Sequence, residues 1–246
     1  MSNESLLSKL DKYNNMFMKE KEITNCSINT IITYKSILNS FYEYITTVEE
    51  LIDIIEIDKE MILNFLNIEK ESANNTKILK LAIIKSYFIF IDETENLNGL
   101  FEMRFKKLTL KRESVEVDAL TDEDVSKLLE VVKQKGRSFN KHRDALLIKP
   151  ILFTGIRASE SLGIKISDMI LIENDTIYKI KINGKGAKER FMYIKKETID
   201  EELEFLISGN YITKYIGITN QGKLMSRVGL YKIISNKMKK AKYNAP

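Results

Sequence analysis

The sequence has little cysteine, proline and histidine. Its single cysteine, Cys26, excludes an internal disulfide and argues against a cysteine-based metal site, so we expect no metal and a reducing, cytoplasmic setting. Only two prolines, Pro150 and Pro246, interrupt the chain, which favours long helices. No segment approaches the roughly 18 apolar residues of a membrane helix, and residues 1–9 lack the apolar stretch of a signal peptide. We therefore expect a soluble protein with no membrane partner.

The composition that is present suits a globular protein of two-domain size. Hydrophobic residues make up 43% and charged residues 30% of the 246 residues, which is too apolar for a disordered chain. The 39 basic residues are set against 35 acidic ones, giving a net charge of +4. A nucleic-acid surface would therefore have to come from segregation of charge and not from a bulk excess.

Helical spacing of apolar residues dominates the first half. It predicts a helix over 6–18, a second that Ser27 caps, a third after Asp58 and a fourth after Asn75. Four such helices can bury one another as a small bundle. The positions expected on the buried sides of the last two are Ile62, Leu63, Phe65, Leu66, Ile78, Leu79, Leu81, Ile84, Tyr87, Phe88 and Phe90.

Asparagines and a glycine break this pattern at 96–99, and a polar stretch follows basic residues there. We place a helical domain over 1–112, a linker over 113–119 and a second domain over 120–246. In the second domain we expect a helix capped by Thr121, helices over 142–153, 158–162 and 229–241, and a β-hairpin over 176–194 with an Asn183–Gly184 turn signal. The predicted fold is mainly α, with a small antiparallel sheet in the second domain.

Two motifs in the second domain point to chemistry. The first, Thr154-Gly155-Ile156-Arg157-Ala158-Ser159-Glu160, places an arginine between a glycine and a new helix. Alone, such an arginine is most often a surface cation. The second, Asn183-Gly184-Lys185-Gly186-Ala187-Lys188-Glu189-Arg190, places a lysine at the hairpin tip. It lacks the spacing and strand-to-helix context of a phosphate-binding P-loop. Taken alone, a lysine at a hairpin tip is usually just solvated.

In this order the two motifs resemble the boxes of the tyrosine recombinase (phage integrase) family, T-G-hydrophobic-R-x-S-E followed by a hairpin with G-K-G-x-K-x-R. The first half agrees, because Ser27, Thr30 and Tyr34 resemble the S-x-x-T-x-x-x-Y stretch of the family's helical core-binding domain. Residues 75–77 resemble the start of its later DNA-facing helix. The resemblance implies a core-binding domain and a catalytic domain that close around duplex DNA as a clamp.

The resemblance also implies roles for individual residues. Arg157 would donate to the non-bridging oxygens of the scissile phosphate, and Lys185 would protonate the departing 5′-oxygen, which arginine cannot do. Glu160 would orient local structure. Strand exchange through a 3′-phosphotyrosine conserves the bond energy, so no cofactor is expected.

The family's later elements are a His-x-x-Arg box, a further His or Trp and a nucleophilic tyrosine. The only histidine, His142, precedes Arg157, and we interpret it as structural. Neither Tyr231 nor Tyr243 is assigned as nucleophile, since Tyr231 falls within the predicted last helix. We expect a chain that stops before the catalytic tyrosine and is inactive alone.

Residues 223–246 contain no Asp or Glu but many basic residues, which suits a surface that contacts the DNA backbone. The residues expected to bind DNA are Thr30, Tyr34, Lys35, Asn75, Thr76, Lys77, Lys80, Lys188, Arg190, Arg227 and Lys232. The expected partners are a double-stranded recombination site and, in the full-length protein, further copies of the chain as a dimer to tetramer.

The function stays open among three hypotheses. The first is site-specific recombination, either Xer-type resolution of chromosome dimers at cell division or integration of a phage or mobile element. The second is a truncated, non-catalytic DNA-binding fragment. The third is a helical adaptor for proteins, which leaves the ordered motifs around Arg157 and Lys185 unexplained.

Overall fold

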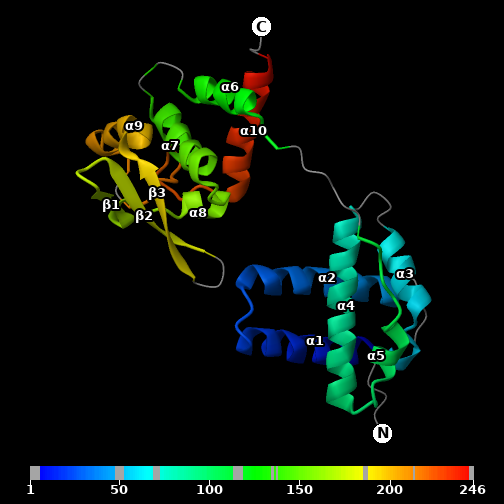
Figure 1. Ribbon diagram of the computed structural model, residues 1–246. Coiled ribbons are helices and arrows are strands. Elements are labelled where there is room, and N and C mark those ends of the chain that lie inside the picture. The colour runs from blue at the N-terminus through cyan, green and yellow to red at the C-terminus, as the bar shows by residue number, and fades with distance from the viewer. Residues whose placement is uncertain are drawn as a thin grey trace. The chain divides into compact units, whose positions relative to one another are not determined.

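The computed structural model describes residues 6–47, 53–68, 73–112, 119–133, 136, 138–184, 188–212 and 214–243, without the side chains of Leu7 and Tyr243. The chain divides into two compact units, Met1–Glu116 and Val117–Pro246 (Figure 1). The predicted linker lies, except for Ala119, outside the described residues. Within the described ranges, no helix is both long and apolar enough to cross a membrane.

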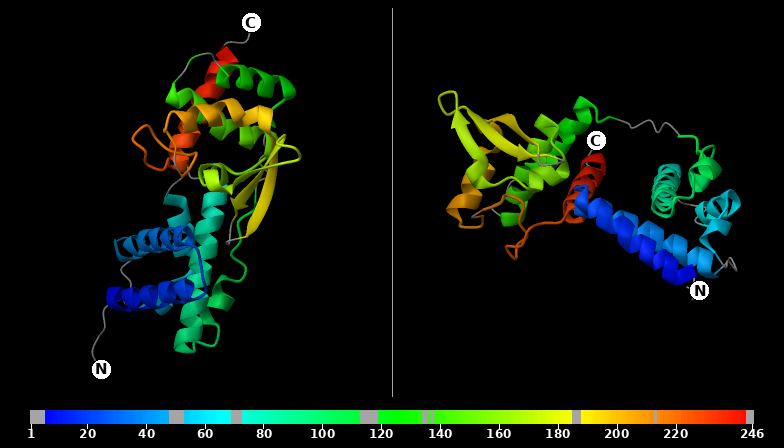
Figure 2. Two further views of the ribbon diagram at one scale, coloured as in Figure 1. Left: turned by 90° about the vertical axis from the view of Figure 1, so that its left-hand side faces the viewer. Right: turned by 90° about the horizontal axis from the view of Figure 1, so that it is seen from below.

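Unit 1 is helical. Its elements are α1 (Leu6–Ile23), α2 (Ile28–Thr47), the 3-10 turn η1 (Ile54–Glu56), α3 (Lys59–Ile68), α4 (Asn74–Glu95) and α5 (Leu100–Phe105). α1 and α2 lie side by side, and α4 runs across them (Figures 1 and 2). Aromatic rings fill the centre, where the ring of Phe88 lies 4.6 Å from that of Phe101 and 5.3 Å from that of Phe105. The predicted helical bundle is confirmed.

Local hydrogen bonds explain where these helices begin. Ser27 Oγ accepts from the backbone N–H of Thr30 at 3.2 Å, and Asp58 Oδ1 accepts from that of Met61 at 2.9 Å. Both are N-cap bonds that satisfy donors without a partner inside the helix. α5 was absent from the sequence expectations. It forms because buried Asp92 accepts from the first-turn N–H groups at 101 and 102, at 3.1 and 2.7 Å.

Two positions predicted as buried are exposed. Leu63 on α3 is 37% exposed and Leu79 on α4 is 47% exposed. Helical spacing indicates a broad apolar arc, but the neighbouring helices cover only part of it. On α4 the covered side carries Leu81, Ile83, Ile84, Tyr87, Phe88 and Ile91.

Unit 2 combines helices with a three-stranded antiparallel sheet in the described part of the chain. Its elements are α6 (Asp122–Val132), α7 (Phe139–Thr154), α8 (Ala158–Leu162), the 3-10 turn η2 (Ile166–Asp168), β1 (Met169–Ile172), β2 (Ile177–Asn183), β3 (Glu189–Lys195), α9 (Lys196–Ser208) and α10 (Arg227–Tyr243). The strand order is β1-β2-β3, with Ile180 opposite Met169 on one side and Met192 on the other. α7 and α9 contact β3, so the inward-facing side chains of the sheet join the helical core.

The predicted mainly helical fold with a small antiparallel sheet is therefore confirmed, with three differences in unit 2. The hairpin forms, but Asn183 still pairs with Glu189, and Gly184 N–H donates to Lys188 O at 2.8 Å. Asn183–Gly184 is thus not a two-residue turn, and neither residue has the positive φ that such a turn requires. β1 and α9 were not expected. β1 is only four residues long, and it is a strand because β2 pairs with it.

Candidate functional site

Arg157 stands between two helices that fix its backbone. α7 ends at Thr154, and the next residue, Gly155, adopts φ +65° and donates its N–H to Ile151 O at 3.0 Å. Glycine suits this left-handed position because it has no Cβ. Ile156 is buried, and Arg157 then takes the N-cap position of α8. The predicted Gly-x-Arg turn before a short helix is confirmed, and it leaves the Arg157 side chain 72% exposed.

Glu160 is the buried partner of that arginine. Its side chain is only 3% exposed, and its oxygens accept from Arg157 N–H at 2.8 Å and from Arg157 Nη1 at 3.1 Å. An acid three residues after the N-cap is the capping-box position. Burial raises the pKa of Glu160, but the hydrogen bonds from Arg157 and the charges of Arg190 and Arg157 outweigh it and hold the pKa below its ordinary value.

Arg190 brings a second guanidinium to the same carboxylate. It lies on β3 opposite Ile182 and donates from Nη2 to Glu160 Oε2 at 2.7 Å. Its side chain is 45% exposed, so part of it faces solvent beside Arg157. Two guanidinium groups share one carboxylate, which leaves a net positive charge suited to a phosphate.

The base of the hairpin loop lies against this cluster. A Cβ on Gly184 would stand 3.6 Å from Glu160 Oε1 and 3.2 Å from Lys188 O. Lys185 follows Gly184 directly, but residues 185–187 lie outside the described residues. Its assignment as general acid therefore stays a prediction.

Ser161 links α8 to α7. It is fully buried and donates from Oγ to Leu147 O on α7 at 2.9 Å. α10 contacts α8 and α6. Its Leu230 is buried in the same core cluster as Leu162 of α8, while Tyr231 and Lys232 are exposed. Arg227, the first residue of α10, is also exposed. The predicted basic helix is present, and its tyrosine at 231 points outward.

The remaining predicted DNA-binding residues are on unit 1. Lys35, Asn75 and Thr76 are exposed. Thr30 is half-buried and its hydroxyl lies 2.8 Å from Ser27 Oγ. Tyr34 is half-buried, with its ring 5.8 Å from that of Phe17, and therefore packs on the core. Lys77 and Lys80 are half-buried.

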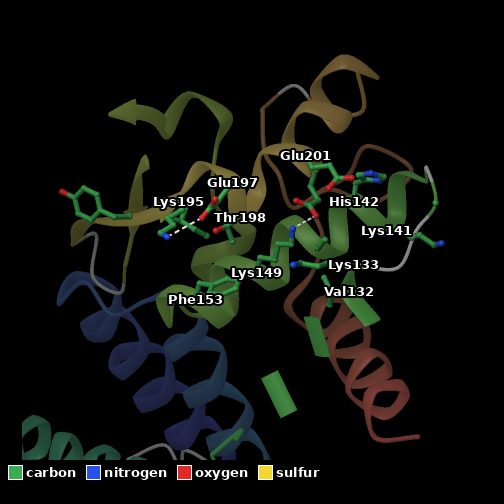
Figure 3. A pocket seen from close by; sticks show the side chains of 15 residues that line it. Val132, Lys133, Lys141, His142, Lys149, Phe153, Lys195, Glu197, Thr198 and Glu201 are labelled. Atoms are coloured by element: carbon green, nitrogen blue, oxygen red, sulfur yellow. Dashed lines mark hydrogen bonds and ion pairs between the residues drawn. The ribbon is translucent and has the colours of Figure 1, made fainter. Parts of the chain in front are cut away.

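A cavity of about 930 Å³ occupies a different side of unit 2, between α7, β3 and α9 (Figure 3). Arg157, Glu160 and Arg190 do not line it. In its wall the buried Lys149 donates to Glu202 Oε1 at 2.5 Å, and Glu202 Oε2 finds no hydrogen-bond partner among the described residues. His142 stacks on Phe205 with ring centroids 3.8 Å apart, which agrees with a structural role.

The contact between Arg190 and Glu160 is not predicted by the sequence motifs. The R-x-x-E spacing of residues 157–160 predicts a capping box, but it does not predict which strand residue bonds to Glu160. No sequence motif indicated the cavity or the Lys149–Glu202 ion pair. Unit 2 brings together Arg157, Glu160, Arg190 and the hairpin base.

Residues 118–246 match the Phage integrase family, and the chain therefore belongs to that family, the tyrosine recombinases. It is 32% identical over 202 residues to "Tyrosine recombinase XerH" of Campylobacter jejuni, a match that covers 79% of this chain and 56% of the relative. It is 25% identical over 247 residues to "Tyrosine recombinase XerC" of Leptospira interrogans, covering 97% of this chain and 75% of the relative.

Two solved structures share the fold. A XerH recombinase bound to a palindromic difH substrate, in a post-cleavage complex, matches with a TM-score of 0.71 and 28% identity over 90% of this chain and 65% of that one. A lambda integrase dimer bound to a COC′ core site matches with a TM-score of 0.68 at 16% identity, over 97% of this chain and 82% of that one. The latter likeness concerns the fold alone. The chain spans a little over half the length of the Campylobacter relative.

Proposed function

We propose that this chain binds a double-stranded DNA recombination site and holds a scissile phosphate for site-specific recombination. The observation that carries the proposal is the Arg157–Glu160–Arg190 cluster beside the hairpin base in a tyrosine recombinase fold. Arg157 donates to the non-bridging oxygens and stabilises charge as the phosphorus becomes pentacoordinate. Arg190 adds a second cation, and Glu160 positions both.

In the cleavage step a tyrosine hydroxyl loses its proton to solvent, its oxygen forms a bond to phosphorus, and the bond from phosphorus to the 5′-oxygen breaks. Lys185 supplies the proton that the departing 5′-oxygen needs. The resulting 3′-phosphotyrosine preserves the bond energy for rejoining, so the reaction needs no cofactor. In the complete protein we propose that a homo-oligomer, from dimer to tetramer, assembles on the DNA; the dimeric lambda integrase complex supports this.

The role in the cell is a finer proposal. XerH, XerC and XerD relatives support an Xer-type function in chromosome dimer resolution at cell division. Integration of a phage or mobile element is the alternative within the same family, since the family model that matches is that of the phage integrases. Both place the protein on DNA, in the nucleoid of a bacterial cytoplasm.

Binding to duplex DNA over a series of salt concentrations tests the phosphate site. The logarithm of affinity falls by about 0.9 per phosphate contact for each unit of log salt. Arg157→Gln and Arg190→Gln should each weaken binding to all sequences and reduce this slope by about 1, whereas Lys106→Gln on unit 1 should leave it unchanged. Unchanged slopes for both arginine variants would contradict the proposal.

A second candidate is DNA binding without cleavage, to which the exposed basic residues Arg227 and Lys232 of α10 would contribute phosphate contacts. A nicked suicide substrate separates the candidates. A covalent protein–DNA adduct supports cleavage by this chain, and salt-dependent binding with no adduct supports the binding role alone.

A further inference from the structure

The outward face of the sheet in unit 2 carries two aromatic rings that are open to solvent. Side chains alternate along β3, and Met192 and Ile194 are buried in the core, so Phe191 and Tyr193 lie on the opposite face. Phe191 is 50% exposed and Tyr193 is 55% exposed. The packing of unit 2 therefore does not explain why these two positions are aromatic.

The register of the sheet places a lysine beside each ring. On β2, Lys179 pairs with Tyr193 and Lys181 pairs with Phe191. Residues that pair across two strands point to the same face. Lys179 Nζ lies 4.2 Å from the centroid of the Phe191 ring, which is a cation–π contact. The outward face thus combines aromatic rings with positive charge.

Positive charge is in excess on this face of the described strands. Alternation adds Lys195 and Glu189 of β3 to the outward set, and Glu189 Oε1 lies 2.6 Å from Lys181 Nζ. Lys195 Nζ lies 3.4 Å from Glu197 of α9, but these two side chains are 75% and 77% exposed, so water screens their attraction. Three lysines against one outward acid make the face attractive to a polyanion.

We propose that this face binds single-stranded DNA, with bases stacked on Phe191 and Tyr193 and phosphates held by Lys179 and Lys195. Exposed aromatic rings beside basic residues hold unpaired bases, whose flat faces a paired duplex keeps covered. The two rings are two positions apart on one strand, about 6.6 Å. Stacked bases of a duplex strand are about 3.4 Å apart, so the spacing suits bases that have separated.

A second copy of the chain is the other candidate for an aromatic face. Protein interfaces favour aromatic residues but are depleted in lysine. In a twofold contact the same patch meets itself, so the lysines of one copy would lie against those of the other. A phosphate backbone removes that repulsion, and single-stranded DNA therefore fits the face better. The inference goes beyond the proposed function, because duplex binding at Arg157 and Arg190 uses none of these side chains.

The test uses fluorescence, because the 246-residue chain contains no tryptophan. Phe191→Trp therefore places a single reporter on this face, and stacking on a base quenches it. The probes are an oligothymidylate of about 12 nucleotides, an abasic strand with the same phosphates, and a duplex of equal length. An excess of unlabelled duplex occupies the proposed duplex site during the single-strand titrations.

Affinity is measured in parallel for Phe191→Leu and Tyr193→Leu, which keep apolar bulk but lose the ring. Met103→Ala is the control, since Met103 is an exposed apolar residue on α5. Circular dichroism melts check that every variant is folded. Sedimentation without DNA checks self-association.

We expect the oligothymidylate to quench Phe191→Trp and the abasic strand and the duplex to leave its fluorescence unchanged. Each leucine variant should bind the oligothymidylate about fivefold or more weakly, as for the loss of one stacked base. Met103→Ala should bind it as the wild type does. Lys179→Gln should lower the salt dependence of single-strand binding by about 0.7 log unit per log unit of salt.

Equal quenching by the duplex or by the abasic strand overturns this inference, because the face would then respond to phosphates alone. Unchanged single-strand affinity in both leucine variants overturns it as well. If Phe191→Leu instead alters self-association without DNA, the face is a protein interface and the inference is wrong. Failure to bind any duplex at low salt contradicts the proposed function, whereas quenching by the single strand would still support the present inference.

Discussion

Arg190 on β3 and Glu160 on α8 meet in a 2.7 Å ion pair, and the Glu160 oxygen that accepts it also accepts the backbone N–H of Arg157 at 2.8 Å. One buried atom thus joins a hairpin strand to the start of a helix. The two motifs, thirty residues apart, become one site through this carboxylate. Changes at Glu160 should therefore affect the fold and the phosphate site together.

Glu160→Gln should lower the free energy of unfolding by about 1–3 kcal/mol. The carboxylate accepts three hydrogen bonds, one from the backbone N–H of Arg157 and one from each guanidinium, and the amide would turn its NH₂ toward some of these donors. The partial exposure of both arginines keeps the loss below that of a fully buried pair. Urea unfolding measures the change. Glu130→Gln, an exposed glutamate on α6, should change stability by less than about 0.5 kcal/mol. A similar effect of both variants would mean that the cluster adds no stability.

The contribution of Glu160 should depend on pH in a defined direction. Its pKa is lower in the folded protein than the ordinary value, so the unfolded chain binds the proton more tightly. The stabilisation is present above an unfolded pKa of about 4.3 and is lost as pH falls through the folded pKa. The stability difference between wild type and Glu160→Gln should shrink as the pH falls below about 4.3 toward the lower folded pKa. A difference that grows on acidification would refute the lowered pKa.

Lys149 and Glu202 offer a test of a buried ion pair, since their side chains are 6% and 7% exposed. Lys149→Met leaves a buried carboxylate without a counter-charge and should cost about 3–5 kcal/mol. Adding Glu202→Leu should recover most of the loss, because the site then becomes apolar. Denaturant melts of the four proteins in the cycle measure the coupling. Additive effects of the two substitutions would show that the pair is not coupled.

Gly217 lies where no side chain fits. A Cβ there would stand 2.8 Å from Leu162 O, a backbone atom at the end of α8. Gly217→Ala should destabilise the protein by about 1–3 kcal/mol through this clash. Gly229 on α10 would meet only the flexible side chains of Met225 and Ser226, and Gly229→Ala should stabilise the helix by about 0.5–1 kcal/mol. The melting temperature should fall for Gly217→Ala and rise for Gly229→Ala. A shift of the same sign in both variants would refute the packing argument.

Local signals in the sequence determined much of the architecture. Caps at Ser27, Asp58 and Thr121 define helix starts, because each satisfies backbone donors within three residues. The hairpin follows from alternating apolar residues, and α8 from a glycine followed by a capping acid. The motifs around Arg157 and Lys185 also indicated the family, because they occur in the order that the family's motifs have along the chain.

Tertiary structure decided what depends on residues far apart in the chain. β1 is a strand because β2 pairs with it. α9 carries Ile199, Leu203 and Leu206 at helical spacing, but the sequence analysis did not predict this helix. Its apolar side is buried because α9 packs against β3 and α7. The sequence predicts an apolar side for α4, but only its neighbours decide that Leu79 lies outside it. Likewise Arg190 reaches Glu160 because the register of β3 turns it inward. Periodicity describes one element at a time, whereas burial and ion pairing depend on the surfaces of two.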